Sequence, residues 1–388
     1  MRQFVRYYFS TLERLFSAKS KGVGVQNISA KDIKACPCPI PPLAEQKRIV
    51  AKIEELFTKL DAGVEALQKV KAELKRYRQA VLKHAFEGKL TAEWREKNKD
   101  KLESASKLLE RITKEREKNV AKTKVRKKKL PLLDTSNLPE LPQEWVWTGF
   151  INLVAHSQNG LSKRRSDAGR PVHILRLSDI HSLEVDGSNP RDIRLAEEEA
   201  VRYKLVVGDL LCIRVNGSPN LTGQMILFKQ KDLWGFCDHF IRFRLAESNV
   251  SPLFFAYQFR TETARKHVSS NMVSSAGQNT VSQTTVLGTP VAITCSEEQD
   301  EVVAEIDRQF SIADEVEQAV EKGLKQAERL RQSILKRAFA GKLVPQNPAD
   351  EPAERLLERI KVEKEKLQAE QKNKKKVMSK KRTKCRGK

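Results

Sequence analysis

The sequence predicts an α+β protein in which two long helices pack as an antiparallel coiled coil and join globular α/β structure. Three observations support this fold class. Residues 45–90 recur as residues 298–343 without a gap, and roughly 19 positions are identical. Both copies repeat apolar residues at helical spacing. Residues 138–294, between the copies, mix short apolar segments with polar loops.

Each copy of the repeat predicts one long helix. Apolar residues alternate at spacings of four and three over residues 49–81, and the second copy keeps this register over residues 302–334. That spacing is typical of a narrow seam facing a partner helix. Gly88 and Gly341 follow the last apolar turn, and glycine adopts the left-handed conformation that ends a helix without a steric penalty.

Charge favours pairing of the two copies with each other. The first copy has about eleven basic and seven acidic residues, and the second about eight basic and ten acidic. Opposite net charges favour a mixed pair over pairs of identical helices. The alternative is that each helix packs on its own neighbouring domain.

The central segment, residues 138–294, predicts a mixed α/β domain. Its helix candidates are residues 196–203 and 252–267. Its strand candidates are residues 145–154, 171–177, 205–215, 224–228, 240–245 and 285–293. The polar loops between them carry side chains able to read base edges and bind phosphates, although ordinary surface loops have the same composition.

Composition limits the possible functions. The chain has 388 residues and a formal net charge of +23, concentrated in residues 113–129 and 371–388. Such basic runs are usually solvated, and their commonest partner is a polyanion. No apolar run is long enough to span a bilayer and the first residues do not resemble a signal peptide, so we expect a cytoplasmic protein.

Motifs for catalysis and for metal binding are missing from the sequence. The Gly-Lys pairs at residues 88 and 341 lack the upstream glycine and the hydroxyl of a phosphate-binding loop. The six cysteines and six histidines show neither a disulfide framework nor a zinc spacing, and Cys36-Pro-Cys38 has no nearby second pair. We therefore expect no catalytic residue, cofactor or metal in this chain.

The repeated helix resembles that of a known family. Each copy begins near Glu-Gln and ends Ala-Phe-x-Gly-Lys-Leu, and each is preceded by a loop of the type Gly-Gln-Asn. This arrangement is similar to the specificity subunit of type I restriction-modification systems. Residues 138–147 look like that family's domain opening, and residues 206–211 like its internal strand.

The resemblance implies a non-catalytic subunit that reads double-stranded DNA through two target-recognition domains, one for each half of a bipartite site. It implies methyltransferase (M) and restriction (R) subunits as partners, and S-adenosylmethionine, ATP and magnesium as cofactors of those partners. The alternative is a coiled-coil adaptor that binds nucleic acid non-specifically through its basic segments.

The resemblance also divides the chain into segments. Residues 1–40 correspond to the end of a first recognition domain, so either the gene start is truncated or the chain dimerises to read two half-sites. Each long helix is followed by a short satellite helix. The remaining segments are the first long helix with its satellite helix (41–112), a basic linker (113–137), the recognition domain (138–294), the second long helix with its satellite helix (295–362) and a basic disordered tail (363–388).

Candidate DNA contacts lie in the polar loops of the recognition domain. Exposed Arg and Lys serve phosphates or guanine, while Asn and Gln pair with adenine edges. The residues selected on these grounds are Lys163, Arg164, Arg165, Asn216, Ser218, Asn220, Gln278, Asn279 and Ser282. Gln278 and Asn279 have counterparts in Gln26 and Asn27, so a role in shaping the loop is an equal alternative for them.

Overall fold

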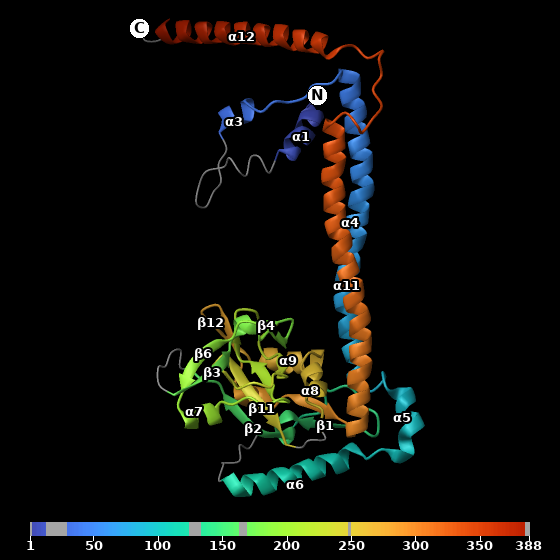
Figure 1. The fold of residues 1–388 in the computed structure, drawn as a ribbon, viewed down its shortest axis with the longest axis vertical. Coiled ribbons are helices and arrows are strands. Elements are labelled where there is room, and N and C mark those ends of the chain that lie inside the picture. The colour runs from blue at the N-terminus through green and yellow to red at the C-terminus, as the bar shows by residue number, and fades with distance from the viewer. Residues whose placement is uncertain (1, 13–28, 124–132, 163–168, 247–249, 385–388) are drawn as a thin grey trace. The chain divides into compact units, whose positions relative to one another are not determined.

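The computed structural model describes residues 2–12, 29–123, 133–162, 169–246 and 250–384, which form two compact units (Figure 1). The helical unit comprises Met1–Ala72 and Val316–Lys388, and the central unit comprises Glu73–Glu315. Two 44-residue helices, α4 (Leu43–Phe86) and α11 (Ser296–Phe339), contribute to both units. These are the helices predicted from the repeat.

The helical unit has a small apolar core where α4 meets α11. Ile49 and Ile53 of α4 are 2% and 0% exposed and pack with Ile334 and Leu335 of α11. Phe4 of α1 (Arg2–Thr11) covers the same cluster. The core therefore lies on the seam that the apolar spacing predicted.

Ion pairs give the direction of the helices within this unit. Asp61 pairs with Arg331, and ten residues further along α4 Lys71 pairs with Glu321 at 2.9 Å. The residue number in α11 falls as that in α4 rises, so the helices are antiparallel. Leu67 packs against Gly323 of α11. A Cβ at position 323 would lie 3.0 Å from the Cδ1 of Leu67, so the absence of a side chain at Gly323 makes room for this contact.

The central unit repeats the antiparallel arrangement in its own part of the pair. Arg78 of α4 forms a 2.6 Å ion pair with Asp314 of α11. Thr91, which follows the end of α4, donates a hydrogen bond at 2.8 Å to Glu298 at the start of α11, so the residue number in α11 again falls as the number in the first copy rises. The predicted antiparallel pairing is confirmed within each unit.

Both long helices end at the predicted glycines. Gly88 and Gly341 have φ values of 67° and 68°. The amide of Lys89 donates to the carbonyl of His84 at 2.9 Å, and the amide of Lys342 donates in the same way to the carbonyl of Arg337. These bonds satisfy carbonyl groups that the end of a helix leaves without intrahelical donors.

A four-stranded antiparallel sheet forms the centre of the central unit. Its strand order is β2 (Val154–Asn159), β11 (Phe240–Leu245), β7 (Leu210–Ile213) and β9 (Met225–Leu227). Both faces are covered, because Leu210 and Cys212 belong to one apolar cluster and the alternating Leu211 and Ile213 to another.

Smaller elements surround this sheet. A second sheet has the order β10-β3-β6, and β1 pairs with β14. The bounds of the smaller elements are α5 (Ala92–Asn98), α6 (Ala105–Thr123), β1 (Val146–Gly149), β3 (Arg170–Leu175), β4 (Ile180–His181), β5 (Glu184–Val185), β6 (Arg191–Leu195), α7 (Glu197–Arg202), β8 (Val215–Asn216), β10 (Trp234–Phe236), α8 (Pro252–Gln258), α9 (Glu262–Ser270), β12 (Val273–Ser275), β13 (Gln278–Thr280), α10 (Gln283–Leu287) and β14 (Pro290–Ile293).

Several local predictions need correction. The helix predicted over residues 252–267 is divided into α8 and α9, and the 3₁₀ helix Phe150–Leu153 interrupts the strand predicted over residues 145–154. Residues 285–293 were expected to form a strand, but the segment begins within α10 because the Ser282 hydroxyl accepts a hydrogen bond from the amide of Thr285 at 2.9 Å and starts a helix. Residues 363–388 were expected to be disordered, but α12 (Ala353–Lys384) continues through most of them. Its sequence is rich in Glu, Lys and Gln, which are good helix formers.

Within the described residues, no helix combines the length and the low charge that crossing a bilayer requires.

Candidate nucleic-acid interface

The described candidate residues of the central unit come together in one loop cluster. The strand order β12-β13-β8 brings the segment 273–280 beside the segment 215–223, although about fifty residues separate them in the chain. Asn279 pairs with Asn216 in the register of β13 with β8. We call residues 215–223 and 273–282 the reading cluster.

The β12–β13 hairpin projects a tight turn from this cluster. Ser275 pairs with Gln278, so Ala276 and Gly277 are the two central residues of the turn. Their φ values are 48° and 75°, as a type I′ turn requires at both positions. The twist of such a turn matches that of the strands, so the hairpin holds its exposed residues in a defined position.

Asn279 fixes the hairpin to the neighbouring segment. Its side-chain amide donates to the carbonyls of Gly217 and Asn216 at 3.0 and 3.3 Å, and its Oδ1 accepts from the Ser274 hydroxyl at 2.6 Å. Asn279 is only 9% exposed. These contacts use both ends of the amide, which favours the loop-shaping alternative for this residue.

Arg265 of α9 holds the other side of the reading cluster. Its guanidinium donates to the carbonyls of Thr222 and Pro219 at 2.8 and 2.9 Å. Burial lowers the pKa of Arg265 from its usual value, although an arginine remains charged at neutral pH. Gly223, with φ of 82°, passes so close to α9 that a Cβ would lie 2.4 Å from Val268.

Two further candidates have structural contacts of their own. The Oδ1 of Asn216 accepts from the amide of Ser218 at 2.8 Å, which closes a turn around its own side chain. Ser282 caps α10 and also contacts the hydroxyl of Thr285 at 2.9 Å. Both side chains shape the backbone that carries the other candidates.

Gln278 and Asn220 are exposed on the same cluster. The backbone carbonyl of Asn220 accepts from Gln224 at 3.2 Å, but its side-chain amide makes no hydrogen bond with the described residues. The same is true of the Gln278 amide and of the partly buried Ser218 hydroxyl. These groups are therefore available to a ligand, on a backbone that Asn279 and Arg265 hold in place.

Lys163, Arg164 and Arg165 lie outside the described residues. Leu161, shortly before them, forms a parallel bridge with Cys237, and both side chains are buried in the same apolar cluster. Gly160 makes this approach possible, because a Cβ there would lie 2.0 Å from the carbonyl oxygen of Cys237.

Sequence reasoning missed two kinds of residue in the reading cluster. Val273 and Leu221 are apolar but 67% and 41% exposed, which suits contact with thymine methyl groups in a major groove. Arg265 was missed because its contacts are with backbone carbonyls more than forty residues away. Exposure and tertiary contacts single out these residues, and neither can be read from the sequence.

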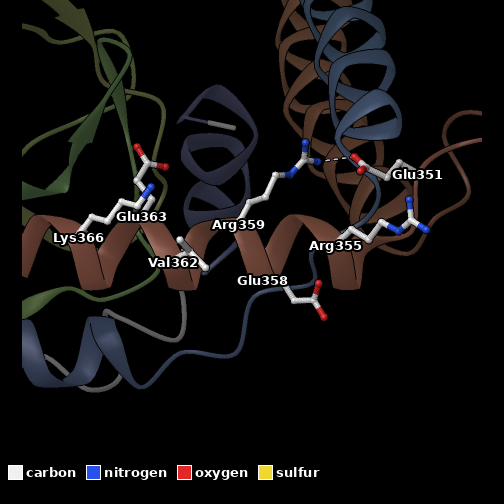
Figure 2. Close-up of a pocket in the computed structure, with 7 residues that line it drawn as sticks. All are labelled: Glu351, Arg355, Glu358, Arg359, Val362, Glu363 and Lys366. Carbon is white, nitrogen blue, oxygen red and sulfur yellow. Dashed lines mark hydrogen bonds and ion pairs between the residues drawn. The ribbon is translucent and has the colours of Figure 1, made fainter.

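A separate pocket of about 550 Å³ lies along α12 in the helical unit (Figure 2). Its lining runs from Glu351 to Lys366 and contains one apolar residue, Val362. Glu351 and Arg359 form an ion pair within it. Small-molecule sites are predominantly apolar, so this charged surface does not indicate a cofactor site.

Comparisons with known proteins identify the family. A family model described as the type I restriction modification DNA specificity domain matches residues 2–76. The specificity subunit of the type I restriction enzyme StySPI from Salmonella potsdam is 33% identical over 356 residues, which are 89% of this chain and 68% of that subunit. The EcoKI specificity subunit of Escherichia coli (strain K12) is 30% identical over 357 residues, with the same two coverages.

A solved structure agrees on the fold. A chain from a study of complex assembly and conformational transition of the type I R-M system superposes with a TM-score of 0.53 and 18% identity, over 87% of this chain and 68% of that one. At this identity the likeness concerns the fold alone. On the sequence comparisons, the chain belongs to the family of type I restriction-modification specificity subunits, the non-catalytic subunits that recognise DNA for the complex.

Proposed function

We propose that this chain reads one half of a split DNA target through the reading cluster, with residues 138–294 as its recognition domain. The observation that carries the proposal is the exposure of Gln278 and Asn220 on a backbone held by Asn279 and Arg265. Base discrimination needs amide groups that are free to bind and fixed in position. The reading cluster offers both properties.

Membership of the family indicates which partners this function would need. StySPI and EcoKI are type I restriction enzymes, and the relatives of this chain are their specificity subunits. We propose that this chain assembles with methyltransferase and restriction subunits in the cytoplasm. S-adenosylmethionine, ATP and magnesium would then belong to those subunits.

The amides of the reading cluster are tested in the assembled complex. Affinity for a cognate and for a scrambled duplex is measured at one fixed salt concentration. Gln278→Ala and Asn220→Ala should each cost about 1 to 3 kcal/mol on the cognate duplex only. Asn98→Ala removes an amide on α5, outside the recognition domain, and should leave both affinities unchanged. Equal losses on both duplexes would reject base reading by these amides.

Arg164 and Arg165 are tested in the same assay. A loss of about 1 to 3 kcal/mol confined to the cognate duplex on Arg164→Ala or Arg165→Ala would mark base readers, and equal losses would mark phosphate contacts. No loss on either duplex would exclude their loop from the interface. The adaptor alternative, which the family does not favour, predicts instead that deleting residues 371–388 abolishes all DNA binding.

We also propose that a second copy of the chain associates with the start of α4. Gln299, at the start of α11, accepts from the amide of Ser251 at 3.0 Å, a donor from the recognition domain. Gln46 is the counterpart of Gln299 in the first copy of the repeat, and its side-chain amide donates to the carbonyl of Pro41. The buried Oε1 of Gln46, however, has no donor among the described residues. A buried acceptor without a donor costs about 1 to 3 kcal/mol, so a partner that supplies one is favoured.

Light scattering of the purified chain tests this association. We expect a concentration-dependent dimer that Gln46→Met weakens, because methionine fills the same space without needing a donor. A monomer at every concentration would reject the association and leave the DNA-reading proposal standing.

A further inference from the structure

Cys237, Asp238 and His239 occupy a tight turn between two strands of the recognition domain. The turn joins the end of β10 to the start of β11, and the amide of Phe240 donates to the carbonyl of Cys237 at 3.0 Å to close it. The amide of Asp238 donates to the carbonyl of Leu161 at 3.0 Å. The turn is therefore anchored from both sides by backbone hydrogen bonds.

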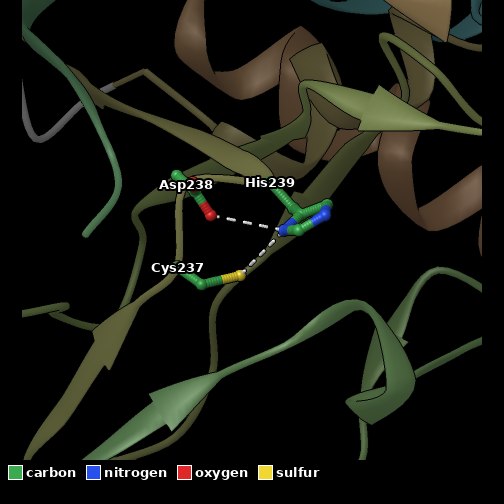
Figure 3. A group of neighbouring side chains, drawn as sticks. All are labelled: Cys237, Asp238 and His239. Carbon is green, nitrogen blue, oxygen red and sulfur yellow. Dashed lines mark hydrogen bonds and ion pairs between the residues drawn. The ribbon is translucent and has the colours of Figure 1, made fainter. Parts of the chain in front are cut away.

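The three side chains converge on the same side of the turn (Figure 3). The Sγ of Cys237 lies 3.7 Å from the Nδ1 of His239, and the Oδ1 of Asp238 lies 3.4 Å from the same nitrogen. All three ligand atoms lie within 4.8 Å of one another. Cys237 is 6% exposed, and the other two side chains are partly buried.

These separations fit tetrahedral coordination. With zinc–nitrogen bonds of about 2.0 to 2.1 Å and a zinc–sulfur bond of about 2.3 Å, neighbouring ligand atoms lie roughly 3.3 to 3.6 Å apart. The two measured distances to His239 fall within or close to this range.

We propose that this turn binds a thiophilic divalent cation of the zinc class through Cys237, Asp238 and His239, with water as a further ligand. Thiolate and imidazole select such an ion over calcium or magnesium, which take oxygen ligands. On binding, the Cys237 thiol loses its proton to solvent and His239 binds as the neutral ring. No electron is transferred in this step.

The turn is connected to the reading cluster, so the ion would stabilise the interface. The amide of Arg214 donates to the carbonyl of His239 at 2.7 Å, and its guanidinium donates to the carbonyl of Asp238 at 3.3 Å. The carbonyl of Arg214 in turn accepts from the amide of Val281 at 3.0 Å. Arg214 directly precedes β8, the strand that pairs with Asn279.

Cobalt titration of the full chain tests the site. In a background where Cys36, Cys38 and Cys385 are replaced by serine, we expect one Co²⁺ per chain with thiolate-to-cobalt charge-transfer absorption, which Zn²⁺ displaces. Cys237→Ser should remove the charge-transfer band, and His239→Asn should weaken binding by at least about tenfold. His181→Asn changes a histidine that also lies beside a carboxylate, Asp186, and should leave binding unchanged.

A background chain that gives no charge-transfer band would overturn the proposal, as would a band that persists unchanged in His239→Asn. The ring of His239 is partly exposed, so that variant remains informative even where Cys237→Ser fails to fold. The cobalt readout does not depend on DNA binding, so its result is independent of the proposed function.

Discussion

Glu298, at the start of α11, accepts hydrogen bonds from four side chains. Its carboxylate takes the hydroxyl of Thr91 at 2.8 Å, the Nε of Arg95 at 2.8 Å, the indole N–H of Trp145 at 2.9 Å and the hydroxyl of Thr294 at 2.7 Å. Glu298 is 0% exposed, and the side chain of Arg95 is 11% exposed. The group therefore connects α5, the residue before β1 and α11 through one buried ion pair.

Replacing Glu298 by glutamine should lower the free energy of unfolding by about 3 to 5 kcal/mol, the cost of removing one partner of a buried ion pair. The amide retains one acceptor oxygen for at most two of the donors, and its N–H₂ group faces the others. Arg95 is then left with its charge largely out of water. A loss of this size is a large fraction of the stability of an ordinary domain.

Urea unfolding followed by tryptophan fluorescence and by circular dichroism measures the change. Glu297→Gln is the matched control, because Glu297 is the exposed neighbour at the same helix start and should cost less than about 1 kcal/mol. In a double-mutant cycle, Arg95→Met should recover part of the loss, with a coupling of about 2 kcal/mol. A Glu298→Gln variant as stable as Glu297→Gln would refute the role given to this buried carboxylate.

Further perturbations address the helix seam, the thiols, the hairpin and the tail. Ile53→Asp should lower the free energy of unfolding by several kcal/mol, because it leaves a charge in a site that is 0% exposed. Leu60→Asp should cost less, because Leu60 is only partly buried, and equal costs in urea unfolding would contradict the position of Ile53 in the seam. Burial raises the pKa of the Cys212 thiol to about 12. At pH 8, iodoacetamide should therefore label the partly exposed cysteines and leave Cys212 unlabelled until the protein unfolds, which mass spectrometry measures. Labelling of Cys212 in the native chain would contradict its burial. Gly277→Val forces a β-branched residue to φ of 75° and should cost about 1 to 2 kcal/mol and weaken cognate DNA binding; unchanged affinity would remove the hairpin from the interface. Deleting residues 371–388 should weaken binding to every duplex and flatten its salt dependence without changing the specificity ratio; a changed ratio would mean that the tail reads sequence.

The long helices could be predicted from sequence because their determinants are local. Apolar spacing set the seam, and a glycine at each end set the stop, so Gly88 and Gly341 were identified correctly. The short elements of the central unit were harder to predict, because single capping contacts decide where they begin. The hydroxyl of Ser282 starts α10 within a segment whose β-branched residues favour a strand.

The candidate site shows a sharper limit of sequence reasoning, because residues of the same chemical type have opposite roles there. Asn279 and Asn220 carry the same amide group. The amide of Asn279 donates to the carbonyls of Asn216 and Gly217, while Asn220 is exposed. What separates them is the pairing of β13 with β8, which places those carbonyls beside Asn279 from a position about sixty residues earlier in the chain. That pairing is a tertiary property, so a list drawn from residue type includes readers and supports together. Alanine replacement should separate the two roles through stability. Asn279→Ala should lower the free energy of unfolding together with the affinity for the cognate duplex, because it removes the hydrogen bonds that hold the hairpin, whereas Gln278→Ala should weaken cognate binding and leave the stability unchanged.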